Sequence, residues 1–177
     1  MAYYKTTYQS PLGQLTLASD GKNLNSLWFE NQKYFGATLP DSVLTSDELP
    51  VFADVKAWLD MYFSGDQSDP SDLPLSPIGS DFRQEVWQFL REIPYGSLVT
   101  YGDIAKMIAR KRGLVSMSAQ AIGGAVGHNP LSIIVPCHRV VGQNGSLTGY
   151  AGGIDRKIRL LELEGVAVAD LTVPSER

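Results

Sequence analysis

Apolar and polar residues alternate near the start of the chain and take a different spacing farther along. After a Pro-Leu-Gly turn, two leucines alternate with polar residues and predict a strand within residues 8–19. The Asp20-Gly21 pair is a hairpin signal, so residues 24–29 are expected to return as the next strand. The first third of the chain is therefore predicted to be built from strands.

Helical spacing replaces this alternation in residues 49–63, which predict an amphipathic helix. Its apolar positions are Val51, Val55, Trp58, Leu59 and Tyr62. Residues 65–79 are rich in Gly, Pro, Ser and Asp, as linkers often are. We therefore predict one domain over residues 1–79, linker included, and a second over residues 80–177.

The second half of the chain predicts four short helices. The first begins after a cap at Ser80 or Asp81 and ends at Pro94, and the others cover residues 100–109, 118–127 and 155–164. Gly165 is placed to close the last helix. The apolar run in residues 131–136 predicts a buried strand that stops at its proline.

Charge is distributed unevenly between the two halves. Residues 1–80 carry four basic and ten acidic residues, a net charge of −6, whereas residues 81–177 carry eleven basic and nine acidic residues, a net charge of +2. If the chain contacts a phosphate backbone, the second half is expected to do so. Arg110-Lys111-Arg112 is expected in a long connection between the two middle helices, which resemble a helix-turn-helix pair.

Composition narrows the class of protein. A length of 177 residues and a hydrophobic fraction of 44% suit one or two small globular domains. No apolar run is long enough to span a membrane, and the N-terminus lacks a signal-peptide pattern. With one cysteine, no internal disulfide is possible, which fits a cytoplasmic protein. One cysteine and two histidines make a structural zinc site improbable, and we expect no metal and no cofactor.

Cys137 is the first candidate for chemistry. A lone cysteine is most often a small buried hydrophobe, but Pro136 precedes this one and the polar pair His138-Arg139 follows it. A nucleophilic cysteine needs a base that favours its thiolate. His138 is such a base if a water molecule bridges the two side chains, because residues adjacent in sequence seldom face each other. A purely structural histidine is the alternative.

Two further features are unusual for their positions. Glu164 stands at the C-terminal end of a predicted helix, where the macrodipole disfavours an anion. A hydrogen bond to His138 would explain it, and a solvated surface carboxylate is the alternative. Gly123-Gly124 interrupt a helix and permit close approach of another backbone, either a second helix or a nucleotide.

Motifs on both sides of the cysteine resemble those of one family. The run PCHRV at residues 136–140 is preceded by GHNP at 127–130 and followed by GYAGG at 149–153. From about Phe82 to Gly165 the chain resembles the O6-alkylguanine-DNA alkyltransferases, also called methylated-DNA–protein-cysteine methyltransferases. The first 80 residues match only loosely. The resemblance implies a ribonuclease-H-like α/β N-terminal domain with a small antiparallel sheet. It also implies a mostly α-helical C-terminal domain with a helix-turn-helix that enters the minor groove.

The resemblance also implies an activity. An alkyl group of O6-alkylguanine, and of O4-alkylthymine, in double-stranded DNA would pass irreversibly to Cys137 of a monomeric protein, once per molecule. The target base would be flipped out of the duplex, because its alkylated oxygen is inaccessible within the stack. His138 would act as a water-mediated base held by Glu164, and Asn129 would brace the active-site turn. Tyr101 would help to rotate the nucleotide and donate a proton to the departing guanine.

A second set of residues is implied to bind the DNA or the flipped base. These residues are Gln120, Ala121, Gly123, Val126, Arg139, Val140, Tyr150 and Ala151. Tyr150 would wall the pocket, and the backbone of Cys137 and Val140 would read the guanine edge. Gln120 departs from the family pattern, which often has an arginine there to fill the gap left by the flipped base. Glutamine lacks the charge and the stacking plane of a guanidinium, so a weaker but functional wedge is predicted.

Two other functions compete with alkyl transfer. An alkyltransferase-like protein binds lesions without removing them, but such relatives lack the acceptor cysteine that Cys137 supplies here. A cysteine hydrolase that uses Cys137 and His138 would need a second reaction step and an oxyanion site, and the sequence holds no motif for either. Alkyl transfer is therefore the favoured interpretation.

Overall fold

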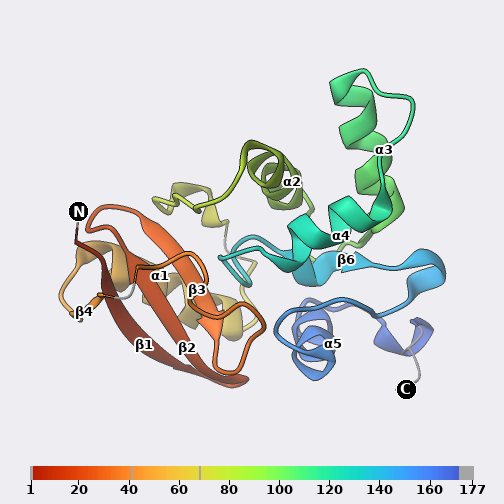
Figure 1. Cartoon of the computed structure of the whole chain (residues 1–177). Coiled ribbons are helices and arrows are strands. Elements are labelled where there is room, and N and C mark those ends of the chain that lie inside the picture. The colour runs from red at the N-terminus through yellow and green to blue at the C-terminus, as the bar shows by residue number, and fades with distance from the viewer. Residues whose placement is uncertain (1, 41, 68, 172–177) are drawn as a thin grey trace. The chain divides into compact units, whose positions relative to one another are not determined.

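Figure 1 shows the computed structural model, which describes residues 2–40, 42–67 and 69–171. The chain forms two compact units. The first contains the described residues up to Gly79 together with Pro130–Ile134, and the second contains Ser80–Asn129 and the described residues from Val135 onward. The segment Pro130–Ile134, which lies in the second domain of the sequence-based division, thus groups with the first unit.

A four-stranded sheet with strand order β3-β2-β1-β4 forms the centre of the first unit. Its elements are β1 (Tyr4–Ser10), β2 (Gly13–Ser19), β3 (Leu24–Phe29), β4 (Leu44–Thr45) and the helix α1 (Pro50–Phe63). The first three strands pair antiparallel, and the hairpin predicted at Asp20-Gly21 is confirmed. The short strand β4 pairs with β1 in parallel, so the sheet is mixed rather than antiparallel throughout.

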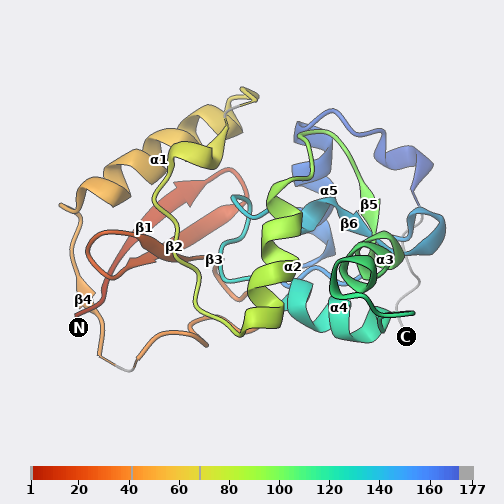
Figure 2. The same cartoon turned by 90° about the horizontal axis from the view of Figure 1, so that it is seen from above.

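Helix α1 covers one face of this sheet, as the views in Figure 1 and Figure 2 both show. All five apolar positions predicted for this helix are buried. The predicted linker contributes to the sheet edge, because Leu24 donates its backbone N–H to Pro74 and accepts one from Ser76. The linker is thus partly held in place by the backbone of β3.

The second unit is mostly helical, as predicted. Its elements are α2 (Asp81–Arg91), β5 (Val99–Thr100), α3 (Tyr101–Arg112), α4 (Ala119–Gly127), a 3-10 turn (Cys137–Arg139), β6 (Val140–Val141), a 3-10 turn (Gln143–Gly145), α5 (Ile154–Leu163) and a 3-10 turn (Val168–Asp170). Helices α2, α3 and α4 pack against one another (Figure 2). The Ser80 cap of α2 is confirmed, since its hydroxyl accepts from the backbone N–H of Arg83.

Helix α3 is longer than predicted. Thr100 and Asp103 form a capping box at its start, and Gly113 ends it in the left-handed conformation with a φ of 69°. Arg110-Lys111-Arg112 therefore forms the last turn of α3 and does not lie in a loop, which corrects the expectation. Cations are favourable there because the helix dipole is negative at its C-terminus.

The strand predicted over residues 131–136 is wrong. Ile133 has a φ of 72°, and the N–H of Ile134 donates to the carbonyl of Ser132 across it. At Pro136 the φ of −81° and ψ of 65° form an inverse γ-turn, closed by a 2.8 Å hydrogen bond from Cys137 N to Val135 O. The segment is buried as expected, but tight turns replace the extended backbone.

None of the helices among the described residues has the length and apolar character needed to cross a lipid bilayer.

Trp87 supports a prediction about stability. Its indole Nε1 donates a 2.8 Å hydrogen bond to the carbonyl of Ala125, which ties α2 to α4. Replacement of Trp87 by Phe removes ring volume and leaves a buried carbonyl without this donor. We expect a loss of about 2 kcal/mol in unfolding free energy, measured by urea denaturation.

Trp58 provides the matched control. It is also buried, but its indole nitrogen has no hydrogen-bond partner among the described residues. Trp58→Phe removes the same volume without breaking a hydrogen bond, so its cost should be clearly smaller. Equal losses in the two variants would show that the Trp87 hydrogen bond contributes nothing measurable.

Candidate active site

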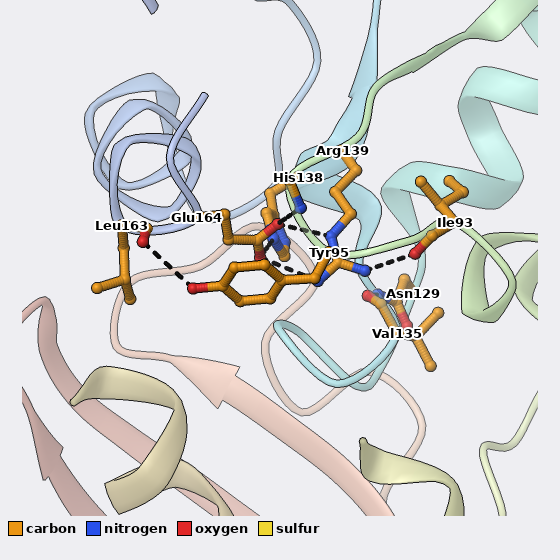
Figure 3. Close-up of polar contacts among 9 residues, drawn as sticks. Ile93, Tyr95, Asn129, Val135, His138, Arg139, Leu163 and Glu164 are labelled. Carbon is orange, nitrogen blue, oxygen red and sulfur yellow. Dashed lines mark hydrogen bonds and ion pairs between the residues drawn. The ribbon is translucent and has the colours of Figure 1, made fainter. Parts of the chain in front are cut away.

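Cys137 begins the 3-10 turn that follows the inverse γ-turn, and its side chain is buried with 5% exposed. The amide Nδ2 of Asn129 lies 3.3 Å from Cys137 Sγ and also donates to the carbonyl of Val135 at 2.8 Å (Figure 3 shows the second contact). The bracing contact predicted for Asn129 is therefore present. It holds the turn and donates to the sulfur at the same time.

Burial raises the pKa of the Cys137 thiol above its ordinary value. The Asn129 hydrogen bond and the positive charge of Lys157 oppose this rise, because both favour a negative sulfur. The buried thiol therefore has a hydrogen-bond donor and a cation nearby, and both stabilise its thiolate form.

His138 is fully buried and donates to Glu164 rather than contacting the sulfur directly. Its Nε2 lies 2.6 Å from Glu164 Oε2 (Figure 3). Burial lowers the pKa of His138, and the hydrogen bond and charge of Glu164 only partly offset this effect. A carboxylate can only accept, so the neutral imidazole carries its proton on Nε2 and leaves Nδ1 as an acceptor. The predicted hydrogen bond between these two residues is confirmed.

Glu164 is the carboxylate that this site is built around. It accepts from Arg139 at both oxygens, at 2.8 and 3.0 Å, and from the backbone N–H of Gly96 at 3.1 Å. Burial raises the pKa of Glu164, but the hydrogen bonds from His138 and Arg139 and the positive charge of Arg139 outweigh this effect. The pKa lies far below the ordinary range, and the group is an anion.

Arg139, predicted to bind DNA, has partners within the chain itself. Its guanidinium forms the two bonds to Glu164, donates to the carbonyl of Ile93 at 2.6 Å and lies over the ring of Tyr95 (Figure 3). These contacts use the side chain within the second unit. Arg139 supports the carboxylate that orients His138.

Gly96 and Tyr95 contribute to the site although sequence reasoning did not single them out. Gly96 has a φ of 77°, and a Cβ there would lie 3.0 Å from the carbonyl oxygen of Glu164. Only glycine suits this position. Tyr95 also donates its hydroxyl to the carbonyl of Leu163 at 3.2 Å. The PYG run that marks the end of α2 was the one available signal.

Tyr101, the first residue of α3, is half-buried near Cys137. Its hydroxyl lies 3.2 Å from the carbonyl of Thr148 and 3.3 Å from that of Gly149. Burial and the charge of Cys137 raise the pKa of Tyr101 to about 12, so its proton is retained at neutral pH. Strand β5 places α3, because Val99 and Thr100 pair in parallel with β6, directly after the cysteine turn.

Helix α4 presents the residues predicted to contact DNA. Gln120 and Ala121 are exposed, and Gly123 is half-buried. A Cβ at Gly123 or Gly124 would meet nothing within 4 Å in the structure described. Within the described residues, no helix packs closely against these glycines, which favours the second of the two explanations, approach from outside.

The remaining predicted residues differ in exposure. Val126 is buried with 2% exposed and belongs to the core side of α4. Val140 is buried in β6, Tyr150 is buried and Ala151 is half-buried in the loop before α5.

The three basic residues at the end of α3 differ in their contacts, since Arg112 pairs with Glu85 at 2.7 Å. Arg110 and Lys111 are exposed.

Sequence reasoning missed Lys157, which is completely buried on α5 beside the loop of Tyr150. Across residues 2–40, 42–67 and 69–171, no three His, Cys, Asp or Glu side chains gather as metal ligands would.

The fold and the site define a class of protein. A helix pair with an exposed, glycine-containing second helix stands in the same unit as a buried cysteine next to a histidine–carboxylate pair. This combination defines a protein with a nucleophilic cysteine and a helix-turn-helix surface.

Comparison with known proteins agrees with this class and is more specific. Residues 81–166 match the family model of the 6-O-methylguanine DNA methyltransferase DNA-binding domain, and residues 3–77 match that of the ribonuclease-like domain. The chain is 44% identical over 169 residues to the methylated-DNA–protein-cysteine methyltransferase of Haemophilus influenzae, covering 96% of this chain and 90% of the relative. The Mycobacterium tuberculosis enzyme of that name is 44% identical, covering 98% and 99%.

Solved structures give the same result. The crystal structure of Mycobacterium tuberculosis OGT in complex with DNA has a TM-score of 0.77 and 41% identity, covering 96% of this chain and 98% of that chain. The chain belongs to the 6-O-methylguanine-DNA methyltransferase family.

The pKa of Glu164 leads to a prediction about stability and pH. Glu164→Gln leaves the Arg139 charge buried without its partner, which should cost about 3 kcal/mol of unfolding free energy at neutral pH. A carboxyl whose folded pKa is lowered stabilises the fold above its ordinary pKa of 4.5, and this contribution is lost as pH falls below that value. The difference between variant and wild type should therefore shrink in acid, measured by urea denaturation over a pH series.

Glu162→Gln is the matched control, because Glu162 is exposed on the same helix. It should stay within about 0.5 kcal/mol of wild type at every pH. A Glu164→Gln deficit that is independent of pH would contradict a buried anion at this position.

Proposed function

We propose that this chain repairs DNA by transferring a methyl or larger alkyl group from O6-alkylguanine, and from O4-alkylthymine, to Cys137. The observation that carries the proposal is the buried Cys137 thiol, braced by Asn129 and followed by a neutral His138 that Glu164 orients. Membership of the family supports it, because relatives over nearly the whole chain are named methylated-DNA–protein-cysteine methyltransferases.

The first step is formation of the thiolate. Nδ1 of His138 is a buried acceptor without a hydrogen-bond partner among the described residues. A water molecule between Sγ and Nδ1 would carry the thiol proton to the imidazole, which Glu164 then stabilises as an imidazolium. This arrangement corresponds to a catalytic triad of a nucleophile, a base and an orienting carboxylate.

The second step is displacement at the alkyl carbon. The thiolate attacks this carbon, the new S–C bond forms, and the C–O bond to guanine breaks. The departing guanine anion takes a proton, for which Tyr101 is the donor because it retains its proton and lies near Cys137. The thioether product has no good leaving group, so each protein molecule acts once.

To reach the lesion, the helix-turn-helix would enter the minor groove of the DNA, and the damaged nucleotide would be flipped out. Flipping costs a few kcal/mol. The exposed face of α4, with Gln120, Ala121 and Gly123, allows the DNA backbone to come close. Tyr150 and Ala151 would border the pocket for the flipped base, and the backbone of Val140 would read its edge. We place this activity in a monomer in the cytoplasm, where thiols stay reduced.

The test is stoichiometry measured by mass spectrometry after mixing the protein with a methylated-guanine duplex. At saturating damaged DNA, we expect one methyl group per protein molecule, located on the peptide that contains Cys137. Cys137→Ser should bind the duplex and acquire no methyl group. A lesion-binding protein or a hydrolase would leave the Cys137 peptide of the wild type unmodified, and many lesions processed per molecule would refute single-use transfer.

Gln120 leads to a separate prediction. It is exposed on the first turn of α4, where a longer cationic side chain would enter the duplex beside the flipped base. Gln120→Arg should therefore increase both DNA affinity and the transfer rate by several-fold, in binding and quenched-flow assays at fixed salt. Gln88→Arg, an exposed glutamine on α2, adds the same charge away from α4 and controls for non-specific attraction. Equal effects of the two substitutions would contradict the predicted wedge role of residue 120.

A further inference from the structure

Lys157 is unusual among the charged residues of the chain because its side chain is completely buried. It projects from α5, and its Nζ donates to the carbonyls of Val140 and Thr148. Val140 follows the cysteine turn directly, and Thr148 begins the loop that contains Tyr150. The ammonium therefore joins the two backbone segments that border the proposed pocket.

A buried cation normally has a carboxylate partner, because an uncompensated buried charge costs several kcal/mol. The ion pairs in the described part of the chain are Arg112–Glu85, His138–Glu164 and Arg139–Glu164. Lys157 takes part in none of them. Its only described partners are neutral carbonyl oxygens, so its positive charge has no counter-charge among the described carboxylates.

The nearby acid that can supply this counter-charge is Cys137. Burial lowers the pKa of Lys157 from 10.5 to about 8, and the Cys137 charge opposes the decrease. The reciprocal effect is present at the thiol, whose ionised form is favoured by the Lys157 charge. At neutral pH most of the Lys157 side chains keep their proton.

The other ionisable groups near the thiol cannot serve as the counter-ion of its thiolate. Burial keeps His138 neutral, and both oxygens of Glu164 neutralise the guanidinium of Arg139. Tyr101 keeps its proton and carries no charge. Among the described residues around Cys137, Lys157 is thus the cation whose charge is not already compensated.

We propose that Lys157 is an electrostatic positioning residue for alkyl transfer, which acts through Cys137 as the counter-ion of its thiolate and holds the Val140 and Thr148 carbonyls in place. This inference rests on the proposed function of Cys137. The bond to Thr148 also reaches Tyr101, since the hydroxyl of Tyr101 donates to the same carbonyl oxygen. Lys157 thereby connects the nucleophile with the proposed proton donor.

The experiment measures ionisation of the single cysteine directly. The ultraviolet absorbance of the thiolate is recorded against pH, and the spectrum of the matching Cys137→Ser protein is subtracted at each pH. Lys157→Met preserves much of the buried volume and removes the ammonium, which in the wild type is still mostly protonated at neutral pH. The thiolate fraction at neutral pH and the single-turnover methyl transfer rate should both fall about tenfold.

Arg159→Met is the matched control, because it removes an exposed cation from the same helix. The thiolate fraction at neutral pH and the transfer rate should stay near the wild-type values in this variant. If Lys157→Met lowers the thiolate fraction at neutral pH no more than Arg159→Met does, the counter-ion role is overturned. A purely structural role for Lys157 would slow transfer without changing that fraction.

A second measurement does not depend on the folding of Lys157→Met. The pKa of the Lys157 ammonium is followed by NMR of the lysine side chains in Cys137→Asp, which carries a negative charge at this position, and in Cys137→Ser, which carries none. By linkage, the negative charge should raise the pKa of Lys157 by about one unit relative to Cys137→Ser. Equal Lys157 pKa values in the two variants would overturn the proposal. Neither titration uses DNA, so failure of methyl transfer by the wild type would count against the proposed function alone.

Discussion

The buried carboxylate of Glu164 is the charge on which the site depends. An anion in the interior is tolerated only when donors surround it, and here they come from separate elements. His138 and Arg139 reach it from the 3-10 turn after the nucleophile, and Gly96 reaches it from the loop after α2. The same oxygens fix the position of the proton on His138, because a carboxylate accepts and never donates. The requirement to compensate one charge thus determines which imidazole nitrogen is left as a hydrogen-bond acceptor.

A second constraint joins the nucleophile to the groups that would act on the substrate. Parallel pairing of β5 with β6 places the start of α3 beside the strand that leaves the cysteine turn. Tyr101 and Lys157 then share the carbonyl of Thr148, so one backbone oxygen relates the hydroxyl to the ammonium. Groups held in this way need little rearrangement as charge moves from sulfur to guanine, which is how preorganised dipoles lower a barrier.

The elements with a clear period were predictable from sequence, and so were the residues within the cysteine motif. Helix α1, the hairpin at Asp20-Gly21 and the Glu164–His138 contact follow from spacing, turn residues and an unfavourable helix end. The run at residues 131–136 was misassigned because its turns depend on contacts distant in sequence, such as the hydrogen bond from Ser132 to Gln32. The contacts of Arg139 within the second unit were not predictable, because polarity beside a nucleophile does not reveal which way a side chain faces. Lys157 could not be identified as a site residue from the sequence, because a single lysine on a helix is ordinarily solvated.

The acidic net charge of −4 constrains how such a protein can bind DNA. Affinity for DNA grows with the number of phosphates that cations neutralise. On α3, Lys106, Arg110 and Lys111 are exposed, whereas Arg112 is paired with Glu85. Helix α3 therefore offers three exposed cations for phosphate contacts, and close approach along α4 and the proposed flipped base would contribute the rest of the binding. Because an alkylated base pairs less well and costs less to unstack, weak phosphate attraction favours damaged sites over the intact duplex. A modest positive surface is thus consistent with a protein that is consumed by each lesion it repairs.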